Sequence, residues 1–313
     1  MPTVSVIIST HNRVEFLPRA IESAKNASRD CEIIVADDAS TDGTAEFCSH
    51  RTDIRYVRLD GHKGVGAVRN AGIRESSGEF ISFHDDDDVR FPGSIDREVR
   101  LLVDNPKAGL AYGPILHGDQ DCNPTDIVDP KETPQGDLFW QLLEWYFLPT
   151  LSIVFRRSCL EHTGMLDESI PGFDEWALCV RIAENHEVVA TAEPIGIWRI
   201  ATPSSGQYSS RFAELWKVFA RHQLELMKLP RAVANPNKCR EVRKATLARM
   251  SDGLIWDADK WLRNGATERA RNSILTALRM NPLRASRLWT FKLLYESLKS
   301  RPDKVVTESR MSN

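Results

Sequence analysis

Residues 79–92 read EFISFHDDDDVRFP and join a short apolar run to a cluster of negative charge. The segment 80–83 (FISF) is β-prone and typical of a strand buried in a sheet. Four consecutive carboxylates, Asp85 to Asp88, follow it. Adjacent negative charges repel one another and resist burial unless a cation or solvent compensates them. Because open α/β sheets bind ligands outside the carboxyl ends of their strands, the stretch predicts a metal site, with a solvated acidic turn as the alternative.

The chain before this stretch alternates strand and helix patterns. Apolar runs at residues 4–9, 33–36 and 54–59 predict strands, and apolar residues recur at helical spacing in 16–24 and 67–76. Strands and helices that alternate at short spacing form βαβ units. We therefore predict an α/β fold with a mostly parallel central sheet flanked by helices.

The pattern is looser beyond Pro92. We expect helices at 94–103, 138–147 and 173–184, strands at 109–116 and 150–155, and one or two edge strands within 188–200. A flexible insertion rich in Asp, Pro and Gly is expected at 118–136. From about residue 208 the pattern is almost entirely helical, with helices at 240–261, 267–280 and 283–299. We predict an α/β domain over residues 1–205 and an all-helical C-terminal extension over residues 206–313.

Composition narrows the class of protein. The 313 residues are 42% hydrophobic, which is enough for a substantial core. No stretch approaches the ~18 apolar residues of a membrane-spanning helix, and the N-terminus has no basic leader, so we expect a cytoplasmic protein. The six cysteines are scattered without a C-x-x-C pair, which favours reduced packing thiols over a zinc site.

Charge is unevenly distributed along the chain. Residues 260–313 hold twelve Lys or Arg and four Asp or Glu, a balance of +8, which leaves −11 for residues 1–259 because the whole chain carries −3. The acidic part would repel nucleic acid, so no nucleic-acid partner is expected. Trp289 and Phe291 lie among basic residues such as Arg284 and Lys292. One hypothesis is peripheral contact with the anionic inner face of a membrane; the alternative is helices with a solvated basic face.

Several segments together resemble the family 2 glycosyltransferases, which are inverting enzymes with the GT-A nucleotide-diphospho-sugar transferase fold. The similar segments, which cover about residues 3–200, are VSVIISTHNR (4–13), VADDASTDGT (35–44), residues 63–92, FRRSCLEHTGMLDE (155–168) and FDEWALCVRIA (173–183). The resemblance implies transfer of a hexose from a nucleotide-sugar donor to a hydroxyl of a glycan or lipid-linked acceptor in cell-surface polysaccharide synthesis.

The resemblance also implies roles for the acidic run. A departing diphosphate builds negative charge, which a divalent cation offsets as a Lewis acid, and oxygen ligands suit Mn²⁺ or Mg²⁺. Alignment to the D-x-D motif makes Asp87 the metal ligand and Asp85 a contact to the ribose or to metal-bound water. Asp86 stands at the variable position and is counted with the nucleotide-sugar contacts. An aspartate at the position of Asp88 often extends the motif in this family. The run can therefore be aligned with the motif in two ways that differ by one residue.

Thr10 and Asp38 are implied to bind the nucleotide. Asp38 matches the residue that hydrogen-bonds the base, and a carboxylate that accepts from N3–H of uracil favours UDP. Thr10 is expected to contact the base or the ribose. Either Asp37 or Asp38 could instead be structural, with Asp37 capping the helix at residues 42–50.

Arg69 and the acidic pair Asp174–Glu175 complete the implied site. Arg69 would neutralise phosphate or contact the base, and its alternative is a helix-surface arginine paired with Glu75. Inversion needs a base that takes the proton of the acceptor hydroxyl. Glu175 occupies that position and Asp174 is its neighbour and rival, with an acid at a helix N-terminus as the structural alternative.

Two departures from the family pattern keep other functions open. The family has a Glu-Asp pair before an aromatic residue, whereas here the order is Asp174-Glu175 before Trp176. Relatives often carry a histidine a few residues after the pair that matches Trp198-Arg199, but Ile200, Ala201 and Thr202 stand there, so water or Arg199 would have to substitute. A catalytically inactive module for assembly or glycan binding is therefore one alternative. A sugar nucleotidyltransferase is another alternative. That class of enzyme requires a Gly-rich basic loop directly after the first strand, and residues 10–13 (THNR) do not form one.

Overall fold

The computed structural model describes residues 3–170, 172–200, 212–286 and 288–299. Strand β1 (Val4–Thr10) lies inside the larger sheet, where it pairs in parallel with β2 (Cys31–Asp37) and β4 (Phe80–Asp85). Alternate residues of β1 enter a core shared with helix α1 (Leu17–Ala27). Ile7 points to the other face, where a side chain at Gly72 would collide with it. The sheet is therefore covered on both faces, as its continuous apolar strands predict.

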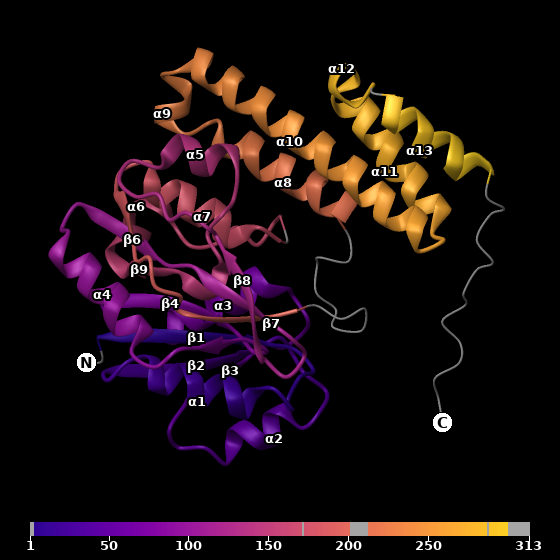
Figure 1. The fold of residues 1–313 in the computed structure, drawn as a ribbon. Helices are drawn as coiled ribbons and strands as arrows, with labels where there is room; N and C mark the ends of the chain where they lie inside the picture. The colour runs from indigo at the N-terminus through magenta and orange to yellow at the C-terminus, as the bar shows by residue number, and fades with distance from the viewer. Residues whose placement is uncertain (1–2, 171, 201–211, 287, 300–313) are drawn as a thin grey trace, which may run out of the picture. The chain divides into compact units, whose positions relative to one another are not determined.

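Within the described residues, seven strands form the larger sheet in the spatial order β10–β6–β9–β4–β1–β2–β3. Figure 1 labels the six strands of this sheet from β6 to β3. The strands not yet named are β3 (Arg55–Arg58), β6 (Ala108–Tyr112), β9 (Val154–Arg156) and β10 (Glu187–Ala190). All neighbours are parallel except β9, which runs antiparallel to both β4 and β6. The predicted mostly parallel α/β sheet is confirmed.

A smaller sheet has the order β5–β11–β7–β8, formed by β5 (Val89–Arg90), β11 (Gly196–Arg199), β7 (Ile115–Gly118) and β8 (Pro124–Asp129). Two predictions about the segments that form this smaller sheet are wrong. The strand expected at 109–116 is two strands in different sheets, because Gly113 and Pro114 interrupt it. The insertion expected at 118–136 contains β8, whose mostly exposed polar residues hide the strand pattern.

Helices cover the larger sheet on both sides. Helix α4 (Ser94–Asp104) contributes to the same core as α1, and α3 (Val65–Glu75) lies against β1 on the opposite face, with α7 (Asp174–Ala183) beside it. The shorter helices of this region are α2 (Thr44–Ser49), α5 (Phe139–Glu144), α6 (Leu160–Thr163) and the 3-10 turns η1 (Thr150–Ser152) and η2 (Arg157–Cys159). The strand expected at 150–155 therefore begins as a helical turn.

The chain divides into two compact units: residues 1–207 with 221–233, and residues 208–220 with 234–313. The predicted boundary at 205–206 lies outside the described residues. The remaining helices are α8 (Phe212–Leu226), α9 (Pro230–Val233), α10 (Pro236–Arg263), α11 (Thr267–Met280), α12 (Pro282–Ala285) and α13 (Leu288–Lys299). The predicted C-terminal helices are confirmed, since every element that the structure describes from residue 212 onward is a helix. In the part of the chain that the structure describes, no helix is both long enough and apolar enough to cross a membrane.

Candidate active site

The loops after β1 and β2 bring Thr10 and Asp38 together. Thr10 is buried at the end of β1, where it is the register partner of Asp37, and its carbonyl oxygen accepts from the backbone N–H of Asp38 at 3.0 Å. The buried Asp38 carboxylate accepts from the backbone N–H groups of Lys63 (2.7 Å) and Gly64 (2.8 Å). Since each carboxylate oxygen has two lone pairs, Asp38 keeps acceptor capacity for a ligand.

Asp37 has a different environment from its neighbour. It is fully buried, and its oxygens accept from the backbone N–H of Ser40 at 2.9 Å and from the hydroxyl of Tyr56 at 2.6 Å. These bonds hold the turn after β2. The prediction that Asp37 caps α2 is wrong, because Asp42 accepts from the Thr44 backbone N–H there, at 3.0 Å.

Two arginines neutralise the middle of the acidic run. Arg13, in the loop after β1, places its Nη1 3.1 Å from a carboxylate oxygen of Asp86 and of Asp87. Arg199, at the end of β11, donates to the same Asp87 oxygen at 2.9 Å. Burial raises the pKa of Asp86 to about 7, although Arg13 acts in the opposite direction. The carboxylate of Asp87, the predicted metal ligand, thus lies between two guanidinium groups.

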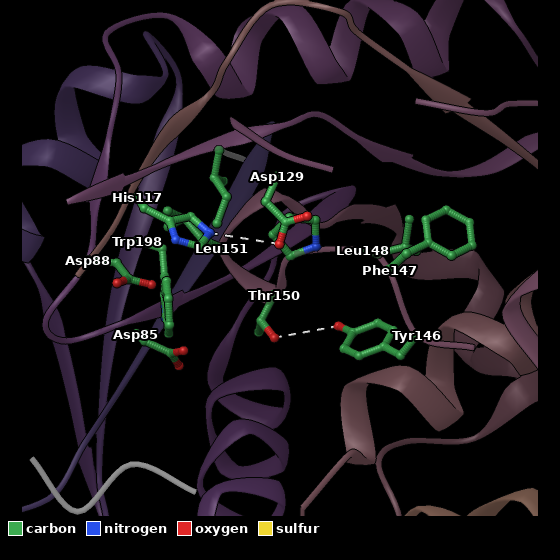
Figure 2. A pocket seen from close by; sticks show the side chains of 12 residues that line it. Asp85, Asp88, His117, Asp129, Tyr146, Phe147, Leu148, Thr150, Leu151 and Trp198 are labelled. Atoms are coloured by element: carbon green, nitrogen blue, oxygen red, sulfur yellow. Dashed lines mark hydrogen bonds and ion pairs between the residues drawn. The ribbon is translucent and has the colours of Figure 1, made fainter. Parts of the chain in front are cut away.

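Asp85 and Asp88, the outer members of the run, line a cavity of about 370 Å³ (Figure 2). Its other walls include His117 and Trp198 from the smaller sheet and Tyr146 and Thr150 from the segment after α5. The rings of His117 and Trp198 meet edge to face, with centroids 5.0 Å apart. The cavity therefore combines negative charge with an aromatic wall, which suits a polar ligand that has a flat or ring-shaped part.

The charge of this cavity fits a hard divalent cation. Burial raises the pKa of Asp88 well above its usual range, and the negative charges of Asp87 and Asp85 raise it further. Carboxylate oxygens are ligands that Mn²⁺ and Mg²⁺ prefer, and a cation bound here would offset the repulsion among these carboxylates. Asp85 and Asp88 are the members of the run that line the cavity, whereas Asp86 and Asp87 do not.

Arg69 connects the acidic run with the acidic pair on α7. This arginine of α3 is buried and donates to Asp85 at 2.9 Å and to Glu175 at 3.0 Å, and it lies 3.6 Å from Asp174. Burial lowers the pKa of Arg69, but the three carboxylates more than offset this effect and raise it. The alternative of a surface arginine paired with Glu75 is therefore wrong.

Glu175 and Asp174 have different access to the cavity. Glu175 is 13% exposed and accepts from the hydroxyl of the cavity residue Thr150 at 3.1 Å. Asp174 is 1% exposed, and among the described residues neither of its carboxylate oxygens has a hydrogen-bond partner. Burial and the neighbouring Glu175 raise the pKa of Asp174 to about 7. Gly66 of α3 lies next to it, and a Cβ added there would be 3.4 Å from the Asp174 carboxylate, close to ordinary van der Waals contact.

Some residues of this site carried no usable sequence signal. Only the tertiary fold brings Thr150 to Glu175 and places Thr150 and Tyr146 in the cavity wall. His117 also lines the cavity, but it lies on a strand that was predicted to end at residue 116. Arg13 lies in the quoted segment 4–13, but its carboxylate partners could not be read from it. Ile200, at the place of the expected late histidine, is 39% exposed, and residues 201 and 202 lie outside the described ranges.

Curated relatives match parts of the chain. An uncharacterized glycosyltransferase from Nostoc is 30% identical over 175 residues, which are 52% of this chain and 54% of that protein. A GalNAc(5)-diNAcBac-PP-undecaprenol beta-1,3-glucosyltransferase from Campylobacter jejuni is 40% identical over 118 residues, 36% of this chain and 37% of that protein. The chain thus spans between about a third and just over half of the length of these two relatives.

Solved structures share the fold at low identity. S. aureus TarS 1-349 in complex with UDP-GlcNAc superimposes with a TM-score of 0.64 at 14% identity, covering 95% of this chain and 89% of that one. A mannosyltransferase from Pyrobaculum calidifontis, in complex with GDP-Man and Mn²⁺, has a TM-score of 0.53 at 18% identity, covering 90% of this chain and 87% of that one. Residues 5–162 match the family described as glycosyl transferase family 2, and the chain belongs to that family.

Proposed function

We propose that this protein is an inverting glycosyltransferase that moves a hexose from a UDP-linked donor to a hydroxyl acceptor. The acceptor would be a glycan or a lipid-linked sugar in cell-surface polysaccharide synthesis. The UDP-GlcNAc and UDP complexes of TarS and the GDP-Man complex of the mannosyltransferase support a nucleotide-sugar donor. The Campylobacter relative, named as a glucosyltransferase that acts on an undecaprenol-linked glycan, supports the class of acceptor.

One observation carries this proposal. Arg69 contacts both Asp85, which lines the cavity, and Glu175, which is one hydrogen bond from the cavity residue Thr150. A single buried cation thus contacts both Asp85, the proposed carboxylate on the donor side, and Glu175, the proposed base. Transfer with inversion needs these two groups on opposite sides of the reacting carbon.

Glu175 would take the proton from the acceptor hydroxyl. It is the more exposed of the acidic pair, and its two oxygens are oriented by Thr150 and Arg69. Asp174, with a pKa of about 7, is partly protonated near neutral pH, which removes negative charge beside Glu175. Thr10 and Asp38 would bind the base and ribose, with the carboxylate of Asp38 accepting from uracil N3–H.

A bound Mn²⁺ or Mg²⁺ would supply Lewis-acid stabilisation to the departing diphosphate. Asp87 is the ligand that the family resemblance predicts, while Asp85 and Asp88 line the cavity. Single Asp→Asn substitutions at these three positions separate the assignments. If the cavity carboxylates hold the cation, D85N and D88N should weaken Mn²⁺-dependent UDP binding about 10- to 100-fold in calorimetry and D87N should weaken it less. If D87N alone removes the Mn²⁺ dependence, Asp87 is the ligand.

A panel of UDP-, GDP- and CDP-sugars with Mn²⁺ tests the activity itself. The wild-type chain should release free nucleotide from UDP-sugars above the rate of a protein-free control. Glu161→Gln, which changes an exposed acid of α6, should behave as wild type. Failure to bind or turn over any nucleotide sugar in the panel would contradict the proposal.

An inactive binding module is the second candidate. Its support is the pairing of Asp87 with both Arg13 and Arg199, which occupies the predicted metal ligand with protein cations. Such a module would bind UDP with no dependence on Mn²⁺ and would release no product. The same nucleotide panel therefore separates the two candidates.

We further propose peripheral membrane contact through α13. Trp289, Phe291 and Tyr295 on this helix are 45%, 50% and 57% exposed, and the side chain of Lys292 is 70% exposed. Exposed aromatic residues beside basic ones are typical of helices that lie on anionic bilayers. Flotation with vesicles that contain anionic lipid should carry the protein upward, and W289A/F291A should reduce this. If the wild type does not float with these vesicles, the proposed membrane contact is wrong.

A further inference from the structure

A second group of potential metal ligands lies outside the carboxylate cavity. His11 follows β1, Asp38 follows β2, and His62 lies between β3 and α3. One ligand atom from each lies within 4.8 Å of the other two. These strands are neighbours in the parallel part of the sheet, so their carboxyl ends bring the three loops together. None of the three residues lines the cavity of Figure 2.

Hydrogen bonds determine which nitrogen of His11 can bind a metal. Its Nδ1 lies 2.7 Å from the carbonyl oxygen of Asp38, which can only accept, so Nδ1 carries the proton. The side-chain amide nitrogen of Asn12 lies 3.1 Å from Nε2 and can only donate, so Nε2 carries the lone pair and accepts from Asn12. A metal ion bound at Nε2 would have to displace this amide. A neutral imidazole whose Nδ1–H is held by a backbone carbonyl is the arrangement that orients metal-binding histidines.

Asp38 and His62 supply one fixed and one adjustable ligand. The Asp38 side chain is 5% exposed and held by two backbone N–H groups, whereas His62 is 64% exposed, with Nδ1 2.9 Å from an Asp38 oxygen. Ligand atoms of one tetrahedral Zn²⁺ are about 3.3 Å apart, since Zn–N and Zn–O bonds measure about 2.0–2.2 Å. The group must therefore contract from separations of up to 4.8 Å. The rings of His11 and His62 lie against each other, with centroids 4.3 Å apart, so the exposed His62 ring must turn relative to His11 to complete the site.

We propose that His11, Asp38 and His62 form a site for a borderline transition-metal ion such as Zn²⁺. Two imidazoles and a carboxylate favour Zn²⁺ over Mg²⁺, which prefers oxygen ligands and retains its water. Because Asp38 is also the proposed uracil contact, Zn²⁺ and UDP should exclude each other. This consequence rests on the proposed function, whereas binding of the metal does not.

The first test is a calorimetric titration of the full chain with ZnCl₂ in the absence of nucleotide. The wild type should bind Zn²⁺, and excess MgCl₂ should not displace it. His62→Ala should lower the affinity by more than about tenfold, since loss of even an outer-shell partner of a metal has an effect of that size. His50→Ala, which removes an exposed histidine after α2, is the matched control and should leave the affinity unchanged. Equal affinities of wild type and H62A would overturn the site.

A second measurement excludes binding through cysteine. Co²⁺ in place of Zn²⁺ should give a visible spectrum without a thiolate charge-transfer band; a strong thiolate band that persists in H62A would overturn the assignment. Competition is then measured with UDP. Zn²⁺ should weaken UDP binding to the wild type and have a much smaller effect on H62A. If UDP does not bind in any buffer, the proposed function fails while the zinc titration still decides the metal site.

Discussion

Arg69 and Arg284 each bind carboxylates through a guanidinium group, but in opposite environments. Arg284, in the helical unit, pairs with Asp252 at 2.6 Å, and their side chains are 44% and 40% exposed. Arg69, in the α/β unit, is 4% exposed and lies within 3.6 Å of three carboxylates. A surface pair gains little because water screens it, whereas buried charges lose their hydration and must compensate one another. The buried cluster is costly to maintain, which is typical of a functional site.

The largest effect is expected when the buried cluster loses its cation. Arg69→Met should lower the free energy of unfolding by about 3–5 kcal/mol, because it leaves buried carboxylates unpaired. Urea denaturation monitored by circular dichroism measures the change. If R69M does not fold, Arg69→Lys, which keeps the charge but loses the planar fork, should give a smaller loss. Wild-type stability in R69M would mean that water already compensates these carboxylates.

The second prediction separates catalysis from folding within the same cluster. Glu175→Gln keeps the shape of the side chain but removes the base, so transfer should fall by roughly 10²–10⁴-fold while UDP binding is retained. Product formation in a single-turnover assay, with calorimetry of UDP binding, measures both properties. Asp174→Asn should reduce transfer less. If the two variants show the reverse order, Asp174 is the base.

The third prediction concerns pH and Asp174. Its pKa is raised to about 7 in the folded protein, so its contribution to stability is fully present below the unfolded pKa of about 4 and is lost as the pH rises through 7. Asp174→Asn stays neutral at every pH. The stability of D174N relative to wild type should therefore increase by a few kcal/mol at most between pH 5 and pH 8, as measured by urea denaturation. A difference that does not change with pH would contradict the raised pKa.

The smallest effect is expected at the exposed pair. Arg284→Met removes a surface ion pair whose partner stays hydrated, so thermal unfolding should be unchanged within error. Added salt should also change the unfolding temperature of the wild type and of R284M by the same amount. If R284M were as destabilising as R69M, burial would not explain the difference between the two arginines.

The central part of the fold could be predicted from the sequence because its strands are continuous apolar runs. The segments 4–9, 33–36 and 80–83 all lie in strands of the larger sheet, and the polar residues that follow them meet at its edge. Strand β8 was missed because its side chains are mostly exposed and its polar composition resembles a loop. A strand on an exposed sheet needs little apolar character, so composition does not reveal it.

Sequence motifs named several residues of the buried cluster but not their pairing, and the roles of these residues stay predictions. Asp38, Arg69, Asp85 and Glu175 were named from motifs, and the structure shows that the last three share one cluster. That Arg13 and Arg199 would both bind Asp87 could not be foreseen, because these residues come from loops and strands far apart in the chain. Motifs specify residue types, whereas the partners of buried charges depend on the tertiary fold.

The acidic run is also a covalent connection between the two sheets. It leaves the larger sheet at the end of β4 and enters the smaller sheet as β5, which pairs with β11. Arg199 of β11 reaches back to the run, donating its backbone N–H to Asp88 and its guanidinium to Asp87. Any movement of one sheet relative to the other would therefore change the spacing of the carboxylates.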